Sequence, residues 1–253
     1  MPHERALEAP ARPSLSRNGG APHLPSVPRA VLFDVDGTLV DSVDLHARAW
    51  QEAFAHFGKR VPYREIRAQI GKGGDQLLPV FLDEEERERM GEWIESFRAD
   101  LFQREYLRHA RPFAHARDLV RRVKQMGLRA GLASSAQREE LEHHLDLLGV
   151  RALVDAATTA DDVDRSKPVP DVFAACAAKL GVDPRDAVAV GDSPFDAIGA
   201  RRAGARAVGL LAGGFPRDAL VFAGCEAIYA DAEDLLRRFD GSPLAPGEAR
   251  AGV

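Results

Sequence analysis

Acidic, basic and hydroxyl side chains stand directly after several short apolar runs of this sequence. Asp34 and Asp36 follow the run AVLF, one residue apart, and lead into the turn Gly37-Thr38. Carboxylates are costly to bury unless a cation or hydrogen-bond donors pair with them. Other features of this kind follow along the chain: Ser134, Lys167, Asp192 and Asp196. Taken together, these residues predict a site that holds a positive group.

The chemistry open to this set follows from its charges. Clustered carboxylates with few histidines suit a hard cation, and an open site with waters and phosphate oxygens suits Mg²⁺. A carboxylate can also attack phosphorus and form an aspartyl-phosphate. That attack needs the phosphoryl charge neutralised by the metal on one side and by a lysine and hydroxyl or backbone donors on the other. Lys167 and Ser134 supply such groups, and a second carboxyl beside the nucleophile could carry the proton.

Alternating strands and helices are needed to bring these residues together. Strand-like runs occupy residues 30–34, 128–134, 152–159, 187–193, 205–213 and 227–232. Helical segments between them imply right-handed βαβ units and a parallel sheet covered on both faces. We therefore predict an α/β fold with a Rossmann-like three-layer core. Ligands of such sheets bind beyond the carboxyl ends of the strands, where the polar residues stand.

One long segment breaks this alternation. About seventy residues before Pro112 contain no convincing strand, and the spacing of Leu45, Ala49 and Ala53 fits one face of a helix. We predict an inserted all-helical cap domain and two disordered tails rich in small residues and proline. The predicted boundaries are 44–111 for the cap, 29–43 and 112–240 for the core, and 1–28 and 241–253 for the tails.

Composition excludes several classes of partner. The formal net charge is -5 and no dense Lys/Arg stripe is interleaved with aromatic residues, so nucleic acid is not expected. No apolar run approaches the ~20 residues needed to span a bilayer. Cys176 and Cys225 stand far apart, which argues against a disulfide scaffold and predicts a cytoplasmic location. We expect a monomer or weak homodimer acting on a small-molecule phosphate ester. Three histidines are expected on helix surfaces: His115, His143 and His144.

Four segments resemble, in order and spacing, the four motifs of the haloacid-dehalogenase superfamily: DVDGTLVDS, LASS, KPVPDVF and VGDSPFD. With the helical insertion, the resemblance spans about 30 to 235. The position of the insertion is similar to that of the C1-type cap in β-phosphoglucomutase, phosphoglycolate phosphatases and sugar-phosphate phosphatases. The resemblance therefore implies a Mg²⁺-dependent enzyme with a helical cap.

The resemblance also implies a role for each motif residue. Asp34 would be the nucleophile and a Mg²⁺ ligand. Asp36 would be the general acid/base and would offer its backbone carbonyl to the metal. Ser134 would bind the phosphoryl group, and Lys167 would pair with both that group and the nucleophile.

The last motif supplies the remaining acidic residues. Asp192 would be a metal ligand, and Asp196 would either bind through the metal's shell or orient Lys167. Dehalogenases and phosphonatases of this superfamily generally lack an acid at the position of Asp36. Its presence favours chemistry on phosphate esters, either hydrolysis or transfer.

Substrate choice is expected to reside in the cap. His46 is similar to the histidine with which cap closure activates the acid/base of β-phosphoglucomutase, although it could equally be a hydrogen-bonded helix residue. Lys72 stands where the family has its substrate-specificity loop and either meets the substrate or faces solvent. The mutase has a Ser-Arg pair where this sequence has Gly73-Gly74. We therefore predict a phosphatase acting on sugar phosphates or phosphoglycolate, with a phosphosugar mutase as the alternative. The intact set of polar residues argues against a non-enzymatic binding module.

Overall fold

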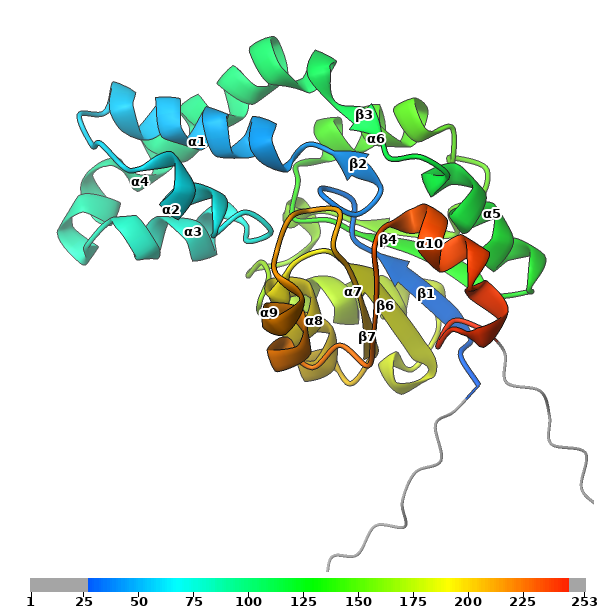
Figure 1. Cartoon of the computed structure of the whole chain (residues 1–253). Coiled ribbons are helices and arrows are strands. Elements are labelled where there is room, and N and C mark those ends of the chain that lie inside the picture. The colour runs from blue at the N-terminus through cyan, green and yellow to red at the C-terminus, as the bar shows by residue number, and fades with distance from the viewer. Residues whose placement is uncertain (1–26, 246–253) are drawn as a thin grey trace, which may run out of the picture.

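The computed structural model describes residues 27–245 of the 253-residue chain (Figure 1). Most of the predicted N-terminal tail, 1–26, and the end of the C-terminal tail, 246–253, lie outside the described residues. Within 27–245, no helix is both long and apolar enough to cross a membrane.

A six-stranded parallel sheet forms the centre of the molecule, in the strand order β5-β4-β1-β6-β7-β8. The central strand β1 pairs with β4 on one side and with β6 on the other, so that Phe33 lies beside both Leu132 and Val190. The chain leaves these three strands at the same edge of the sheet. The strand bounds are Ala30–Phe33 for β1, Arg129–Ala133 for β4, Ala156–Thr158 for β5, Ala187–Gly191 for β6, Arg206–Leu210 for β7 and Ala227–Tyr229 for β8. The predicted α/β fold is confirmed.

Each face of the sheet has its own apolar core because successive strand residues point to opposite faces. Val31 and Phe33 pack into the core lined by α5, α6 and α10, whereas Ala30 and Leu32 pack into the core lined by α7 and α8. The helix bounds are Ala116–Gln125 for α5, Arg138–Leu148 for α6, Asp171–Leu180 for α7, Pro194–Ala203 for α8, Arg217–Ala223 for α9 and Ala232–Arg237 for α10. Burial on both faces explains why these strands are continuously apolar.

A helical segment with a separate apolar core follows β1 (Figure 1). Its members are α1 (Val43–His56), α2 (Tyr63–Arg67), α3 (Gly74–Phe81), α4 (Glu84–Leu101), a π-helical turn at Phe102–Tyr106 and a 3-10 turn at Leu107–His109. Trp50, Phe54, Leu77 and Ile94 are buried together between these helices. The predicted limits of a cap domain at 44 and 111 stay a prediction.

Two short strands join the helical segment to the sheet domain. β2 (Val40–Asp41) and β3 (Arg111–Pro112) pair antiparallel, so the chain enters and leaves the segment side by side. The sequence did not predict these strands, because two residues are too few to show a β pattern.

Two segments differ from their predicted extent. β5 is shorter than the apolar run 152–159, because the backbone N–H groups of Leu153 and Val154 bond to Val150 in a turn that follows α6. The apolar core also includes a residue past the predicted core boundary at residue 240. Leu244 is fully buried in the same core as Phe239.

Candidate active site

Asp34 stands one residue beyond β1 and is buried between two partners. The ammonium of Lys167 donates to its Oδ1, and the hydroxyl of Thr38 donates to its Oδ2 at 2.8 Å. Burial and the nearby carboxylate of Asp196 raise the pKa of Asp34 to about 7, against the opposing charge of Lys167. The residue predicted as the nucleophile therefore lies against the predicted lysine.

Three buried carboxylates gather around this lysine. Asp34, Asp192 and Asp196 each offer an oxygen, and these atoms lie within 4.8 Å of one another. Burial and the other two carboxylates raise the pKa of Asp192 well above its usual range. Three carboxylates against the single ammonium of Lys167 fit a divalent cation that prefers oxygen ligands. The carboxylate of Asp36 is not in this cluster, which leaves its backbone carbonyl for the predicted metal contact.

The start of α8 fixes Asp196. Ser193 caps this helix, and its backbone N–H and hydroxyl both donate to Asp196 Oδ2, at 3.1 and 2.6 Å. The other oxygen, Oδ1, contacts Lys167 Nζ at 2.9 Å. Of the two roles left open for Asp196, this geometry favours the orientation of Lys167.

The turn after Asp36 needs glycine for two reasons. Gly37 has a φ of 86°, a conformation that residues with a Cβ rarely adopt. A Cβ there would also lie 2.5 Å from Oδ2 of Asp192. The turn therefore brings the chain close to the carboxylate cluster.

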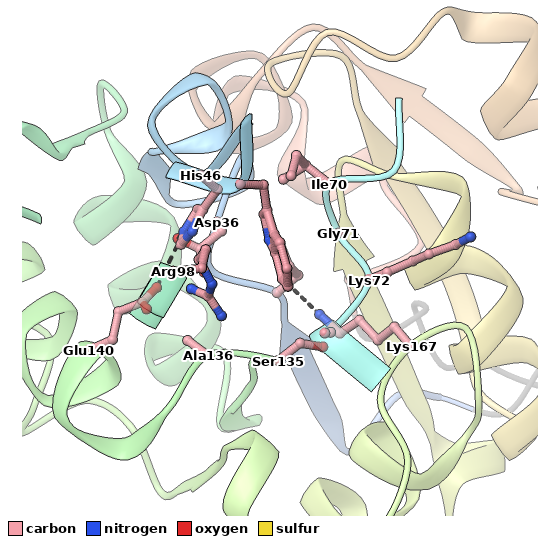
Figure 2. Close-up of a pocket in the computed structure, with 14 residues that line it drawn as sticks. Asp36, His46, Ile70, Gly71, Lys72, Arg98, Ser135, Ala136, Glu140 and Lys167 are labelled. Atoms are coloured by element: carbon pink, nitrogen blue, oxygen red, sulfur yellow. Dashed lines mark hydrogen bonds and ion pairs between the residues drawn. The ribbon is translucent and has the colours of Figure 1, made fainter. Parts of the chain in front are cut away.

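Asp36 and three other side chains form a ring of alternating charge, made of Asp36, His46, Glu140 and His144, and called here the Asp36 ring. Oδ1 of Asp36 contacts Nε2 of His46 at 3.1 Å and Nε2 of His144 at 3.3 Å. Oε1 of Glu140 contacts the same two nitrogens, at 3.2 Å for His46 (Figure 2) and at 3.7 Å for His144. The hydroxyl of Ser42 also donates to Oδ1 of Asp36.

The charges in the Asp36 ring stabilise one another. Burial alone would raise the pKa of Asp36 and lower the pKa of each histidine. The two carboxylates nevertheless raise the pKa of His46 to about 9 and that of His144 to about 10. The histidines in turn hold the pKa of Asp36 well below its usual range and lower that of Glu140. Both imidazoles are therefore charged at neutral pH.

The expectation that His144 lies on a helix surface is wrong. Its side chain is fully buried, and it stands one helical turn after Glu140 on α6. The signal was present in the spacing, because His144 follows Leu141 by three residues and precedes Leu148 by four. This spacing places His144 on the apolar face of the helix. The other two histidines predicted on helix surfaces, His115 and His143, are exposed.

The serines at the end of β4 differ in their surroundings. Ser134 is fully buried, and its hydroxyl accepts the backbone N–H of Ala136 at 3.0 Å. Ser135 and Ala136 line a pocket together with Lys167 (Figure 2). Within the described residues, the buried hydroxyl of Ser135 has no hydrogen-bond partner. Ser135 is thus a phosphate-binding candidate that the sequence analysis missed.

This pocket lies between the helical segment and the end of the sheet. The lining residues from the sheet domain are Asp34, Asp36, Ser135, Ala136, Glu140 and Lys167. Those from the helical segment are His46, Trp50, residues 70–74 and Arg98. The candidate nucleophile and both predicted cap residues therefore border one cavity.

The lysine and the arginine that line the pocket from the helical segment are arranged differently. The ammonium of Lys72 donates to Gln69 at 2.7 Å and lies over the ring of Phe195, and Figure 2 shows it pointing away from the other labelled side chains. Arg98 lies over the ring of Trp50, 5.0 Å from its centroid. Its buried Nε has no hydrogen-bond partner within residues 27–245. Arg98, which the sequence analysis missed, therefore faces the pocket where Lys72 was expected.

Contacts across the pocket hold the helical segment against the sheet domain. The carboxylate of Asp75 accepts the backbone N–H of Ser166 at 3.0 Å, and the guanidinium of Arg67 donates to the carbonyl of Gly213 at 3.1 Å. A Cβ on Gly73 would lie 2.2 Å from the Ser166 hydroxyl. The glycines of this loop therefore permit a close approach next to Lys167.

Comparisons with known proteins agree with this geometry. A family model described as haloacid dehalogenase-like hydrolase matches residues 31–210. Validoxylamine A 7'-phosphate phosphatase of Streptomyces hygroscopicus subsp. limoneus is 32% identical over 193 residues, which are 72% of this chain and 85% of the relative. Hexitol phosphatase B of Escherichia coli (strain K12) is 32% identical over 194 residues, with the same two shares of 72% and 85%. The solved structure of a hydrolase from Pseudomonas syringae has a TM-score of 0.77 and 30% identity, covering 84% of this chain and 98% of that chain.

Proposed function

The chain belongs to the haloacid dehalogenase-like hydrolase family, and we propose that it hydrolyses small phosphorylated metabolites through an aspartyl-phosphate formed on Asp34. As a phosphoric monoester hydrolase, it would act on esters of the sugar-phosphate or phosphoglycolate type. The observation that carries the proposal is the placement of Asp34, Asp36 and Lys167 around one pocket. Phosphate-ester chemistry needs a nucleophile, a proton carrier and a cation at such a site.

The reaction would proceed in two displacements. A carboxylate oxygen of Asp34 attacks phosphorus, and the bond from phosphorus to the ester oxygen breaks. Asp36, which the two histidines keep ionised in the free protein, takes up a proton as the anionic substrate binds and gives it to the leaving alkoxide. Water then attacks the phosphorus of the aspartyl-phosphate while Asp36 takes up one of its protons. Inorganic phosphate leaves, and the carboxylate of Asp34 is restored.

Fixed donors would hold the transferring phosphoryl group. The ammonium of Lys167 and the unpaired hydroxyl of Ser135 line the same end of the pocket as Asp34, with the predicted phosphate ligand Ser134 next to them in the chain. Donors already in place need no rearrangement as negative charge develops. The carboxylates of Asp34 and Asp192 and the backbone carbonyl of Asp36 would hold Mg²⁺. When bound, that ion would neutralise charge on the phosphoryl oxygens.

The rest of the substrate would lie against the helical segment. Trp50 offers an aromatic face and Arg98 a cation, and both line the pocket beside Asp36. These groups suit a small hydroxylated or anionic leaving group, because donors and an aromatic face bind such groups well. Lys72, the predicted substrate contact, would reach this group only after leaving Gln69.

A phosphate-release assay tests the proposal. We expect steady release from a panel of sugar phosphates and phosphoglycolate with Mg²⁺, and its loss with chelator. Asp34→Asn should abolish release and prevent trapping of an acyl-phosphate on the protein. Release no greater than that of Asp34→Asn would refute the phosphatase. Formation of an isomerised sugar phosphate that depends on a bisphosphate primer would instead identify the mutase.

A further inference from the structure

The contacts to Asp36 fall on one of its two carboxylate oxygens. Ser42, His46 and His144 all contact Oδ1, and Oδ2 takes part in none of these contacts. A carboxylate that must exchange a proton with substrate needs one oxygen free and correctly aimed. Within residues 27–245, the Asp36 ring therefore holds Oδ1 and leaves Oδ2 outside its contacts.

Two members of the Asp36 ring lie outside both the four motifs and the helical segment. Glu140 and His144 are both on α6, with side-chain exposures of 5% and 0%. Burial of charged groups without partners is costly, and breaking a buried pair is strongly destabilising for the partner left behind. Neither side chain contacts Asp34, Lys167 or Asp192 in the described part of the chain, so neither belongs to the phosphoryl end of the site.

Glu140 also balances the charge of the Asp36 ring. Two imidazolium groups facing Asp36 alone would leave an unpaired buried cation. Glu140 contacts the same two nitrogens and makes the number of positive and negative charges equal. Removal of Glu140 would therefore leave both histidines competing for a single carboxylate.

His46 connects the Asp36 ring to the helical segment. It lies in the first turn of α1, and its ring stacks on Phe102 with centroids 4.0 Å apart and an angle of 6° between the planes. Phe102 begins the turn through which the chain returns toward β3. The Asp36 ring thus joins the loop that carries Asp36, the helical segment and α6.

We propose that Glu140 and His144 are positioning residues that hold Oδ1 of Asp36 and so direct Oδ2 at the leaving-group oxygen. This inference rests on the proposed function, in which Asp36 carries the proton. Its consequence is specific to the leaving group. An alkoxide needs the proton in order to leave, whereas a nitrophenolate leaves readily without it.

Adjacent residues of the same type on α6 provide matched controls. Glu140 and His144 are buried, whereas Glu139 and His143 are exposed. The variants to compare are Glu140→Gln with Glu139→Gln, and His144→Leu with His143→Leu. His144→Gln is the conservative variant, because a glutamine amide can place an N–H donor near Oδ1, where Nε2 of His144 lies at 3.3 Å. Asp36→Asn gives the full effect of losing the proton carrier.

The readout is kcat/KM for an alkyl phosphate and for p-nitrophenyl phosphate with each variant, because kcat/KM reports formation of the aspartyl-phosphate and not its later hydrolysis, in which Asp36 acts on both esters. We expect Glu140→Gln and His144→Leu to lower kcat/KM for the alkyl phosphate at least tenfold and kcat/KM for the nitrophenyl ester less than about threefold. His144→Gln should regain most of the loss, and both exposed-site controls should match wild type. Combining His144→Leu with Asp36→Asn should add little to Asp36→Asn alone, because both act through one proton transfer.

Equal losses on the two esters, or no loss on either, would overturn the positioning role. Thermal melting of each variant identifies misfolded protein, and Glu140→Gln, which keeps the side-chain shape, carries the test if His144→Leu does not fold. Failure of the proposed function looks different. In that case, wild type itself would hydrolyse neither ester above the level of Asp34→Asn.

Discussion

Replacing Asp34 by asparagine is expected to stabilise the metal-free protein at alkaline pH while it abolishes activity. Burial and Asp196 raise the pKa of Asp34 from 3.8 to about 7. The folded protein therefore binds the proton more tightly than the unfolded chain does. The contribution of Asp34 to the free energy of unfolding is fully present below pH 3.8. This contribution falls as the pH rises, and it is lost completely above pH 7.

The size of the effect follows from this shift. Each pKa unit corresponds to ~1.4 kcal/mol, so the ionised Asp34 costs up to about 4 kcal/mol of unfolding free energy at pH 8. An asparagine side chain at this position would not carry the charge, and Lys167 would keep Asp196 as a partner at 2.9 Å. For a chain of this size, that gain corresponds to a melting temperature about 8–16 °C higher.

Thermal unfolding in chelator at pH 5 and pH 8 measures the effect. The difference in unfolding free energy between Asp34→Asn and wild type should grow by roughly 2–3 kcal/mol from pH 5 to pH 8, in favour of the variant. Adding Mg²⁺ should raise the melting temperature of wild type more than that of the variant. Asp100→Asn, at an exposed site on α4, serves as the control and should change stability by less than about 0.5 kcal/mol. A variant that melts at or below wild type at pH 8, or an advantage that does not change with pH, would refute the reasoning.

Three further predictions concern the helical segment and the core. Gly73→Ala should raise KM and lower kcat, because the added Cβ would lie 2.2 Å from the Ser166 hydroxyl. Steady-state kinetics should show that a second substitution, Ser166→Gly, restores both constants. A double variant as impaired as Gly73→Ala would contradict this contact. Arg98→Gln should raise KM about tenfold with little change in kcat, since a charge-assisted hydrogen bond contributes about 1.5–3 kcal/mol; the exposed-site variant Arg89→Gln should match wild type in the same assay. Cys176, whose pKa burial raises to about 12, should resist iodoacetamide at pH 8 until the protein unfolds, and mass spectrometry detecting its modification in folded protein would disprove this.

The sheet and the phosphoryl end of the site could be predicted from the sequence. Alternating strands and helices fix the direction of every strand, so residues that follow strands must meet at one edge. Asp34 and Asp192 follow the neighbouring strands β1 and β6, and Lys167 reaches them from the loop before α7. Backbone topology alone determines these placements.

The leaving-group end could not be predicted in the same way. The spacing of His144 from Leu141 and Leu148 indicates a buried helix face, but no local signal places His144 beside Asp36, because only tertiary packing brings these charges together. Arg98 belongs to the pocket because α4 packs against α1, where the guanidinium lies over the ring of Trp50, a tertiary arrangement with no local signal. Lys72 lies in the predicted loop, but Gln69 and Phe195 fix the direction of its side chain.

The short pair formed by β2 and β3 has a consequence for the exchange of parts between related enzymes. Since the helical segment begins and ends at this one ribbon, residues 43–109 can be replaced as a unit without altering the order of the strands. A transplanted segment would bring its own residues at the positions of Trp50 and Arg98 and leave Asp34 and Lys167 in place. It would also have to supply a side chain that fits between Asp36 and Glu140, as His46 does here. Compatibility between a donor segment and this host therefore depends on the residue at the position of His46, in addition to the contacts that Arg67, Gly73 and Asp75 make with the sheet domain.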